Sequence, residues 1–391
     1  MKHEACIVGG GPSGTLVATK LASKGFYTVI FEEHSTIGVP NHCAGLISVK
    51  GLARLGIKPN PDFYQNNIYG GRIYSPDGEF IEIRDSRPRA HVIDRASFDQ
   101  YLAHRSENEG AIIHKNSHVK QVKKGKIRIN NDWIPSELVI NAEGAGGRLM
   151  RRSGLGYDPP ELIMGYNTEI EGVDVDPELV EIWFGEDITK DFFAWVIPID
   201  EKRVRAGLGT SSNKGLEKFK SFIKKRFNKN DLHLVNAGQI CVGGPVRRTV
   251  YDNMLLVGDV AGQVKATTGG GVIIGGLCAQ IAGEAASEYL EGRSSLVKYD
   301  NLWRNKYGFE LKSMCTLRKI LNRVDDDRFN KIFHRTREKN IEDKLQHLLE
   351  TGDLDMQSSV IRNALFDPTI LSILVKGMGE LALSELFSLF R

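Results

Sequence analysis

The stretch Ala5-Cys6-Ile7-Val8-Gly9-Gly10-Gly11-Pro12-Ser13-Gly14 decides the fold of this chain. Its first four residues are a short apolar run, and an amphipathic segment follows the glycines as far as Gly25. A second apolar run, at 27–31, then ends at Glu32. This order of strand, glycine turn, helix, strand and acid predicts a βαβ unit that binds a dinucleotide.

The three glycines of the turn have separate expected roles. Gly9 allows a tight turn, Gly11 lets a pyrophosphate approach the backbone, and Gly14 lets the helix pack closely on the strand. Glu32 is expected to accept hydrogen bonds from the ribose hydroxyls. A helix N-terminus stabilises an anion by only about 0.3 to 2 kcal/mol, so a dinucleotide needs further contacts elsewhere in the chain. The motif alone leaves open which dinucleotide is bound.

Composition narrows the class of protein. The 391 residues exceed one ordinary domain, so two or three lobes with a sizeable core are expected. With 52 basic and 49 acidic side chains, the formal net charge of +3 indicates no nucleic-acid partner. The five cysteines are widely spaced and include no CxxC pair, so neither a disulfide framework nor a zinc site is indicated. A reducing cytoplasm is the expected location.

The sequence predicts neither a secretory signal nor a membrane span. Residues 1–4 lead straight into the first strand and leave no room for a signal peptide. No uninterrupted run of about 20 apolar residues occurs. The nearest approaches, 269–286 and 369–390, are interrupted by polar and charged residues, and both predict helices packed on other elements.

A loop and several short strands are expected after the first unit. Residues 34–48 are rich in turn formers, which indicates a functional loop beside the cofactor. Alternation over 71–83 predicts a hairpin with its turn at 75–78. A helix is expected at 96–110, and short strands are expected at 111–113, 118–122, 126–129 and 138–141.

A change of character after residue 160 predicts a second lobe. Strands of an antiparallel sheet are expected at 162–170, 179–184, 192–197 and 203–208. Residues 215–228 then predict an amphipathic helix, whose apolar face is formed by Leu216, Phe219, Ile223 and Phe227. A solvated helix face accounts for its many cations. Attraction to anionic lipid or to a phosphate-bearing substrate is the alternative.

The chain is expected to be helical from residue 299 onward. Its last segment has apolar residues at helical spacing, namely Ile370, Ile373, Leu374, Met378 and Leu381. This face is expected either to pack in the core or to contact a membrane surface.

A second motif far along the chain separates the candidate cofactors. A buried-type strand at 254–257 ends at Gly258-Asp259, and Thr267-Thr268-Gly269-Gly270-Gly271 precedes a helix expected at 272–290. An acid at a strand end can bind a sugar-like hydroxyl, and a glycine-rich helix start can meet an anion or a carbonyl edge. FAD needs both contacts because its ribityl chain and isoalloxazine ring extend beyond the pyrophosphate. An NAD fold needs neither.

With these residues in view, the chain resembles the FAD-dependent geranylgeranyl reductase family, which is close to the p-hydroxybenzoate hydroxylase type of flavoprotein. The resemblance covers residues 1–300 and is greatest to archaeal digeranylgeranylglycerophospholipid reductases. It rests on separated motifs, namely 9–14 with Glu32, CAGLIS at 43–48, DRASFD at 94–99, and GDVAGQVK at 258–265 with TTGGG at 267–271.

The resemblance implies an α/β (α+β) fold with three parts. A discontinuous Rossmann-like FAD-binding domain of the p-hydroxybenzoate hydroxylase type is expected at 1–60, 85–155 and 240–298. An inserted substrate-binding domain with an antiparallel sheet is expected at 61–84 and 156–239, and a C-terminal helical region at 299–391.

The resemblance also implies which residues hold FAD. The ADP half is assigned to Gly9, Gly11, Ser13, Gly14, Glu32, Arg95 and the backbone of Val119. The ribityl and flavin half is assigned to Gly258, Asp259, Gly270, Gly271 and Val272, with Cys43 and Ala44 near the ring. For Arg95, a salt bridge with Asp94 or Asp99 is the alternative role.

A substrate pocket is implied by a P-x-x-Y-x-W-x-F-P stretch in the family, which here reads KDFFAWVIP at 190–198. Trp195 and Pro198 match the pattern, whereas Lys190, Phe193 and Ile197 replace proline, tyrosine and phenylalanine. The pocket is therefore expected to stay apolar and to lack a phenol hydroxyl. A plain core-strand role is the alternative for Trp195. Glu143-Gly144 is a second departure, since related flavoproteins have Asp-Gly there.

The implied activity is reduction of C=C double bonds in the geranylgeranyl or polyprenyl chains of membrane lipids, by hydride transfer from reduced flavin N5. Cys43 is the candidate catalytic residue, and an inert buried thiol is its alternative role. No second GxGxxG follows a strand, so a built-in NADPH domain is not indicated. The expected electron donor is therefore reduced ferredoxin or a transiently bound NAD(P)H. Peripheral contact with the inner membrane surface is also expected. The rival functions are an FAD-dependent aromatic or lipid monooxygenase and an electron-carrying flavoprotein.

Overall fold

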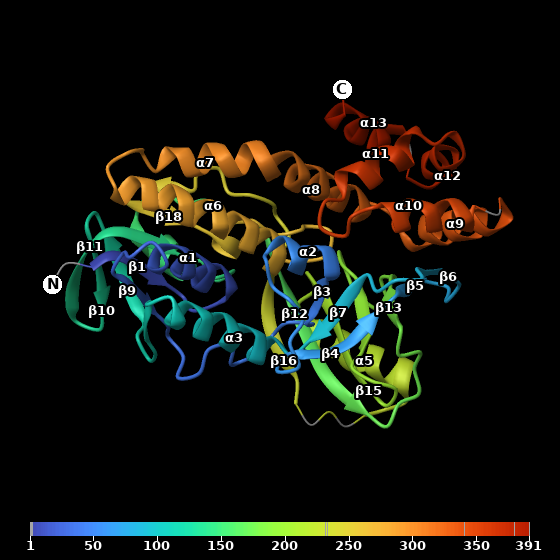
Figure 1. Cartoon of the computed structure of the whole chain (residues 1–391). Coiled ribbons are helices and arrows are strands. Elements are labelled where there is room, and N and C mark those ends of the chain that lie inside the picture. Colours follow the sequence, from blue (N-terminus) through green and yellow to red (C-terminus); the bar gives the residue numbers. More distant parts are fainter. Residues whose placement is uncertain (1–2, 231, 233, 340, 379, 391) are drawn as a thin grey trace. The chain divides into compact units, whose positions relative to one another are not determined.

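The computed structural model (Figure 1) describes residues 3–230, 232, 234–339, 341–378 and 380–390. Within it the chain divides into two compact units, which are described separately. Unit 1 comprises Met1–Asn41, Arg95–Leu162 and Cys241–Lys312, and unit 2 comprises His42–Asp94, Ile163–Ile240 and Ser313–Arg391. The three-domain division expected from the sequence stays a prediction.

Unit 1 is built on a mainly parallel sheet with the strand order β17-β18-β11-β1-β2-β8. Strands β18, β11, β1, β2 and β8 run parallel, while β17 pairs antiparallel with β18. An antiparallel ribbon of β9 and β10 continues from β11. The strands are β1 (His3–Val8), β2 (Thr28–Phe31), β8 (Ile112–His114), β9 (Val119–Lys123), β10 (Lys126–Ile129), β11 (Asp132–Asn141), β17 (Val250–Tyr251) and β18 (Met254–Leu256).

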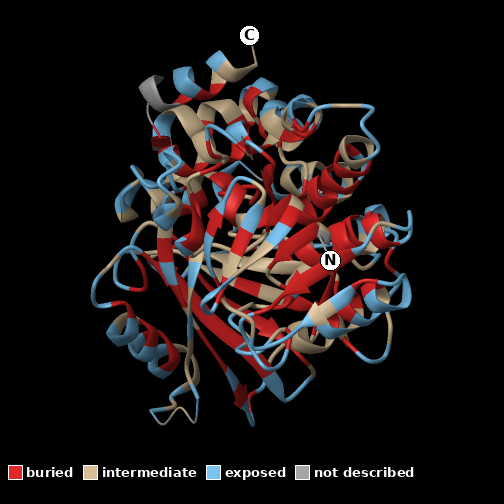
Figure 2. Cartoon of the chain, turned by 90° about the vertical axis from the view of Figure 1, so that its left-hand side faces the viewer, coloured by how far each residue is buried: buried red, intermediate tan, exposed pale blue. Residues whose placement is uncertain are grey.

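Buried aliphatic strands force helices to cover this sheet, because a parallel sheet must be shielded on both faces. In β1, for example, Ala5, Cys6 and Ile7 are fully buried, and Figure 2 shows buried residues concentrated along the strands. The long helix α6 lies beside α1. The helices of unit 1 are α1 (Pro12–Ala22), α3 (Arg95–Asn108), α4 (Arg148–Ser153), α6 (Val272–Leu290) and α7 (Val297–Trp303), with a 3-10 turn η1 (Gly258–Ala261) and a π-helical turn η2 (Arg304–Gly308). These bounds confirm the predicted helices at 96–110 and 272–290.

Unit 2 contains two sheets. The larger has the order β16-β12-β15-β14-β13-β5-β6, and the smaller has the order β3-β7-β4. Their strands are β3 (Leu46–Ser48), β4 (Tyr64–Ile68), β5 (Gly70–Tyr74), β6 (Phe80–Arg84), β7 (Ala90–Ile93), β12 (Leu162–Glu171), β13 (Leu179–Trp183), β14 (Ala194–Pro198), β15 (Arg203–Thr210) and β16 (Asn236–Cys241). The predicted hairpin is confirmed, since β5 and β6 pair antiparallel around the turn at 75–78.

Two sequence expectations for unit 2 need correction. The strands predicted at 162–170, 179–184, 192–197 and 203–208 do pair antiparallel, as β12 with β15, β15 with β14, and β14 with β13. The larger sheet is not antiparallel throughout, however, because β13 also pairs with β5 in parallel. Helix α5 (Gly215–Phe227) is amphipathic as predicted, but Leu216 is exposed. The buried face is formed instead by Gly215, Phe219, Phe222 and Ile223, at helical spacings of i, i+4, i+7 and i+8.

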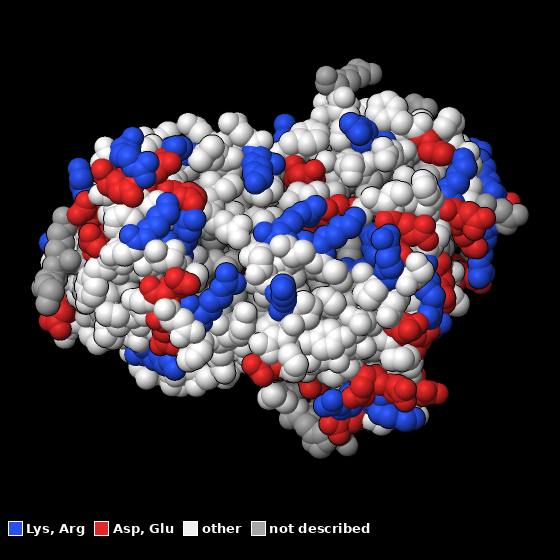
Figure 3. Space-filling view, in the orientation of Figure 1, with Lys and Arg blue, Asp and Glu red and all other residues white. Residues whose placement is uncertain are grey.

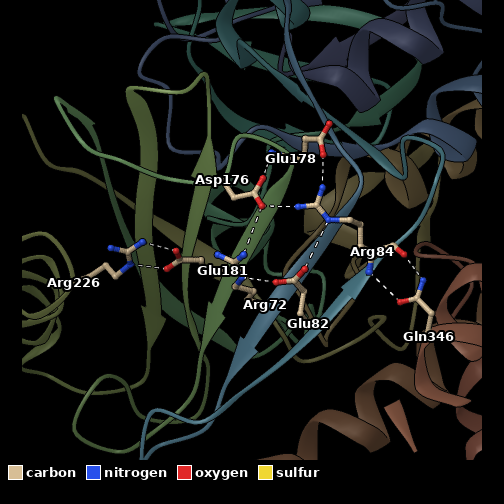
Figure 4. A network of polar contacts seen from close by, with 8 residues as sticks. All are labelled: Arg72, Glu82, Arg84, Asp176, Glu178, Glu181, Arg226 and Gln346. Atoms are coloured by element: carbon tan, nitrogen blue, oxygen red, sulfur yellow. Dashed lines mark hydrogen bonds and ion pairs between the residues drawn. The ribbon is translucent and has the colours of Figure 1, made fainter. Parts of the chain in front are cut away.

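An ion-pair network joins the β5–β6 hairpin to its neighbours in unit 2 (Figure 4). Arg84 pairs with Asp176 and Glu178 in the segment before β13. Arg226 of α5 makes two hydrogen bonds with the buried carboxylate of Glu181 on β13. The pKa of the Arg226 guanidinium is raised by this hydrogen bonding, against an opposing effect of burial. One cation of α5 is therefore already used within the fold.

The other described helices are a short one between β3 and β4 and a series that runs from residue 309 to residue 389. They are α2 (Val49–Arg54) in unit 2, α8 (Phe309–Leu321), which spans the boundary between the units in sequence, and α9 (Asp326–Glu338), α10 (Glu342–Thr351), α11 (Ser358–Phe366), α12 (Pro368–Met378) and α13 (Glu380–Leu389). The apolar face predicted near the C-terminus buries Ile370, Ile373 and Met378 within this unit. The side chain of Leu381 lies outside the described residues. Among the described helices, none alone has the length and apolarity to cross a bilayer; one pair, α11 with 368–376, passes that test together but is bent by 92°.

Candidate functional site

The glycine turn of unit 1 has the geometry that its sequence predicts. Gly9 has a φ of +97°, and a Cβ there would lie 2.5 Å from the Ala142 carbonyl oxygen. A Cβ on Gly14 would lie 2.1 Å from the Gly9 carbonyl oxygen, so this position requires glycine for close packing. A Cβ on Gly11 would meet no described atom within 4 Å. The backbone at Gly11 thus faces open space into which a phosphate can fit.

Glu32, at the end of β2, holds the glycine turn directly. Its Oε2 accepts a hydrogen bond from Gly10 N at 2.7 Å, and its Oε1 accepts one from His34 N at 2.9 Å. The side chain is about one-tenth exposed. Its Oε1 also lies 2.7 Å from His34 Nδ1, whereas Oε2 has the one bond from Gly10 N and retains acceptor capacity. Glu32 can therefore brace the turn and still accept from a ribose hydroxyl.

Two further residues predicted for the ADP half lie in unit 1. Arg95 begins α3 and makes a two-point contact with Asp99 one turn later, with N–O distances of 3.0 and 3.1 Å. This is the salt bridge considered as its alternative role, and it leaves a contribution to cofactor binding as a prediction. Val119 begins β9 and is buried in the core, so only its backbone is available to a ligand.

The two distant motifs come together at the start of α1 and the end of β18. A Cβ on Gly258, where φ is +79°, would lie 2.6 Å from Ser13 Oγ. A Cβ on Gly271 would lie 2.4 Å from Asp259 Oδ1. Gly270 bridges to Lys265, and Val272 begins α6. Ser13, Asp259 and the 270–272 turn therefore form one continuous cradle beside the glycine turn.

Asp259 supplies the ionisable side chain of this cradle. Desolvation by the surrounding protein raises the pKa of its carboxyl, and the positive charge of Arg95 opposes that rise. The residue is half-buried, and a largely desolvated carboxyl is costly unless a partner hydrogen-bonds to it. A hydroxyl-bearing ligand would supply such a partner.

Two supports of the site were not predicted. Gln263 accepts a hydrogen bond from Gly258 N at 2.9 Å and donates to Tyr299 Oη at 2.8 Å, and that hydroxyl in turn donates to Leu256 O. Glu143 accepts from Leu149 N and Met150 N, which caps α4. Only the glutamine in the 258–265 motif and the departure at Glu143 signalled these positions. Together the cradle and its supports fit a dinucleotide with a hydroxyl-bearing extension.

The loop that carries Cys43 lies in unit 2. Cys43 is half-buried, and its Sγ accepts a hydrogen bond from Gly45 N at 3.4 Å. The carbonyl oxygen of His42 accepts a hydrogen bond from Asn167 Nδ2, at 2.9 Å. The carbonyl oxygen of Ala44 accepts from Arg205 Nη1, also at 2.9 Å. Strands β12 and β15 therefore hold the backbone on both sides of the thiol.

Arg205, which sequence reasoning missed, is the centre of this arrangement. It is 2 % exposed. Besides Ala44, its guanidinium donates to the Ile93 carbonyl, to Gln65 Oε1 and, through two nitrogens, to Glu169 Oε1. These contacts match the five N–H donors of a guanidinium, which presents them in a fixed fork. A Cβ on Gly45 would lie 2.4 Å from Arg205 Nη1, so this glycine admits the arginine.

The predicted substrate residues form an aromatic layer on β14 and the segment before it. Phe193, Trp195 and Pro198 are buried. Phe193 meets Trp195 edge-on, with ring centroids 6.1 Å apart, and stacks on Phe192 at 4.3 Å. Trp195 lies against Gly207 of β15, where a Cβ would come within 2.4 Å of the indole. Its Nε1 is buried and has no hydrogen-bond partner among the described residues. This layer is compatible with an apolar substrate and with a plain core role.

Comparison with known proteins adds the family. The family of the NAD(P)-binding Rossmann-like domain matches residues 7–42. A digeranylgeranylglycerophospholipid reductase 2 of Methanothermobacter thermautotrophicus is 34% identical, covering 84% of this chain and 90% of the relative. A digeranylgeranylglycerophospholipid reductase of Methanocaldococcus jannaschii is 29% identical, covering 83% of this chain and 88% of the relative.

Solved structures agree on the fold. A geranylgeranyl bacteriochlorophyll reductase-like protein of Thermoplasma acidophilum superposes with a TM-score of 0.81 at 24% identity, covering 99% of both chains. The flavin-dependent brominase Bmp2 gives a TM-score of 0.69 at 16% identity, covering 93% of this chain and 98% of that one. The chain therefore has the fold of these structures, with a Rossmann-like domain in it.

Proposed function

This chain belongs to the digeranylgeranylglycerophospholipid reductase family, and on that premise we propose that it saturates C=C bonds in the polyprenyl chains of membrane lipids. The observation that carries the proposal is the 34% identity to a reductase of that name across most of both chains. The flavin monooxygenase alternative has only fold-level likeness behind it, because the other flavoproteins compared are at most 17% identical.

The cofactor of the proposed enzyme is FAD. Gly9, Gly11 and Gly14 would receive the pyrophosphate, and Ser13, Glu32, Arg95 and Val119 would hold the ADP half. The half-buried carboxyl of Asp259, whose pKa is raised by desolvation and which lies beside Gly271, supports binding of a ribityl hydroxyl. Gly258, Gly270 and Val272 would hold the flavin half, and Cys43 and Ala44 would face the ring.

Reduced FAD supplies a hydride when it is bound. An isolated alkene offers no carbonyl oxygen for the protein to stabilise, so the protein's share is to position the chain, exclude water and stabilise developing positive charge. Phe193 and Trp195 suit the last two tasks, because both rings are buried and aromatic ring faces are mildly negative. Pro198 is the last residue of the same strand, β14. Phe193, which replaces the tyrosine of the family pattern, keeps the aromatic ring that these roles need but has no phenol hydroxyl.

Cys43 is the proposed catalytic residue, where it positions the alkene, tunes the ring or supplies a proton. Replacing Cys43 with alanine is expected to leave FAD bound and to lower the turnover of lipid at least about tenfold. Flavin absorbance of the purified protein reports the first outcome, and mass-spectrometric analysis of product lipids reports the second. Cys315→Ala is the matched control, because Cys43 and Cys315 are both half-buried while the other three cysteines are buried. Unchanged turnover in Cys43→Ala would remove the thiol from the mechanism.

The proposed enzyme also needs an electron donor and access to membrane lipid. Reduced ferredoxin or NAD(P)H would deliver electrons, and a peripheral contact with the cytoplasmic membrane surface would give access to lipid. Exposed lysines of α5, such as Lys220, Lys224 and Lys225, support attraction to anionic lipid. Sedimentation with anionic liposomes tests this contact, and protein that stays wholly in the supernatant speaks against it.

Lipid analysis of cells with and without the protein tests the proposed function. Reduction adds two hydrogens at each double bond, so we expect polyprenyl lipids to gain mass in steps of about two daltons per bond saturated. A gain of one oxygen instead would establish the monooxygenase. Flavin bleaching by a donor with every isoprenoid left unsaturated would establish an electron carrier.

A further inference from the structure

A pocket of about 390 Å³ lies within unit 2, and its wall begins at Ser48, at the end of the Cys43 loop. Its wall is formed by the end of β3 and the start of α2, by the segment between β6 and β7, and by the segment after α10. This volume is in the range of small-molecule sites, which is about 300–1,000 Å³. None of its lining residues has a part in the proposed chemistry.

One of the cations in the pocket is already neutralised. Arg89 pairs with Asp85 at 3.1 Å, and the same guanidinium donates to the carbonyl oxygens of Glu350 and Gly352, at 2.6 and 2.9 Å. Arg89 thus ties the strand segment to the end of α10. Its role is to build the wall, and its charge is balanced by Asp85.

Two other cations in the wall are not balanced in this way. Lys50 and Arg87 are exposed, and neither side chain makes an ion pair with any residue that the structure describes, although the charge of Arg87 also attracts the Asp85 carboxylate that Arg89 pairs with. His91 also lines the pocket, but burial lowers its pKa, so the imidazole is neutral near pH 7 and adds no charge. On the face shown in Figure 3, Lys and Arg side chains gather over α2. The pocket therefore keeps two positive charges for a ligand.

The rest of the wall is apolar. Val49, Pro88 and Leu354 contribute hydrocarbon surface beside the two cations. A ligand that matches both the cations and the apolar wall carries one or two negative charges next to a hydrocarbon group. Guanidinium and ammonium groups are the usual protein ligands of phosphate.

We propose that this pocket binds a phosphate group, namely the phosphate at the glycerol end of the polyprenyl lipid substrate. The inference rests on the proposed function and adds to it a site for the head of the substrate. Strand β3 joins the pocket to the Cys43 loop, because Ser48 lines the pocket and follows Cys43 by five residues. Five extended residues span at most about 18 Å, a distance that a long, flexible prenyl chain can follow.

The test compares substrates with and without phosphate. The double variant Lys50→Gln/Arg87→Gln is expected to raise the KM for a digeranylgeranylglycerophospholipid by about tenfold, with kcat nearly unchanged. The KM for geranylgeraniol, which has the same chain and no phosphate, is expected to stay at the wild-type value. The control Lys124→Gln/Lys202→Gln removes the same charge at two exposed positions and is expected to behave as wild type. Equal KM changes for both substrates, or no change for either, would overturn the inference.

Titration with inorganic phosphate separates the two sources of this ligand chemistry. If the pocket is the head-group site, phosphate competes with the phospholipid substrate, does not compete with geranylgeraniol, and loses its binding in the double variant. Phosphate that binds at the pocket without competing with the phospholipid would overturn the assignment to the lipid. Wild-type protein that reduces neither substrate would overturn the proposed function alone, since calorimetric phosphate binding by wild type and variant still tests the pocket.

Discussion

Replacing Asp259 with alanine is expected to weaken FAD binding by about 10- to 150-fold, because a hydrogen bond to a charged group contributes about 1.5 to 3 kcal/mol. The half-buried carboxyl lies in η1, just after β18, next to Gly271 and the start of α6. Asp259→Asn keeps the size of the side chain and an acceptor oxygen, so it is expected to lose less affinity. Flavin fluorescence during titration of the FAD-free protein measures both constants.

The same residue predicts a pH dependence of stability in the FAD-free protein. Burial raises the pKa of the Asp259 carboxyl above its ordinary value of 3.8, and Arg95 opposes the rise. The folded state therefore holds this proton more tightly than the unfolded state. The associated stability is fully present below pH 3.8 and is lost as pH rises through the raised pKa.

Asparagine carries no charge at any pH, so it avoids that loss. FAD-free Asp259→Asn is expected to melt at a higher temperature than FAD-free wild type near pH 7, and the difference is expected to shrink as the pH falls toward 4. FAD affinity of the wild type should rise with pH over the same window, because a hydroxyl donor favours the ionised carboxylate. Asp132→Asn, at an exposed position of the same unit, is the control. A pH-independent difference, or FAD affinity that is unchanged in Asp259→Ala, would contradict this role.

Local sequence predicts the features that depend on near neighbours. The conformation of Gly9 and the packing of Gly14 follow from the G-x-G-x-x-G spacing between a strand and a helix, which is typical of the turn of a dinucleotide-binding βαβ unit. The hairpin at 70–84 is predictable for the same reason, since its turn at 75–78 joins adjacent strands.

Features that depend on long-range pairing were not predictable. The parallel pairing of β13 with β5 joins segments about a hundred residues apart, and no turn chemistry encodes it. The exposed Leu216 shows the same limit on a helix. Spacing allowed it on the apolar face, but Gly215 occupies the first-turn position against Tyr166. Cys43 was predictable only as a motif, because the partners that hold its loop are spread over the whole of unit 2.

Replacing Arg205 is expected to have a large effect on the stability of unit 2. Its donors reach the Cys43 loop, β4, the end of β7 and β12, so removing it leaves several buried acceptors without partners. Glu169 is half-exposed and recovers solvation when the arginine is removed, so the loss of stability comes mainly from the buried acceptors left without a donor, each worth about 1–3 kcal/mol. Arg205→Ala is therefore expected to lower the free energy of unfolding by about 3 kcal/mol. Chemical denaturation of the FAD-loaded protein measures this change.

Arg205→Lys separates positioning from stability. Lysine keeps the positive charge but has three donors on one nitrogen, so it cannot reach Ala44, Ile93, Gln65 and Glu169 together. With the bond to Ala44 O lost, the Cys43 loop is expected to loosen. In a Cys315→Ser background, iodoacetamide should therefore modify Cys43 faster in Arg205→Lys than with arginine present, while buried cysteines stay unmodified.

The decisive comparison is with Glu169→Gln. That change removes the charge that pairs with Arg205 but leaves the contacts to Ala44 and Ile93, so it is expected to lower stability without changing the rate at which Cys43 is modified. Lipid turnover should follow the modification rate rather than the stability: kcat falls in Arg205→Lys and stays near wild type in Glu169→Gln. If both variants lose kcat in proportion to stability, Arg205 only stabilises the fold. If they separate as stated, the arginine positions the loop, and the chemistry at Cys43 depends on a residue 162 positions away in the sequence.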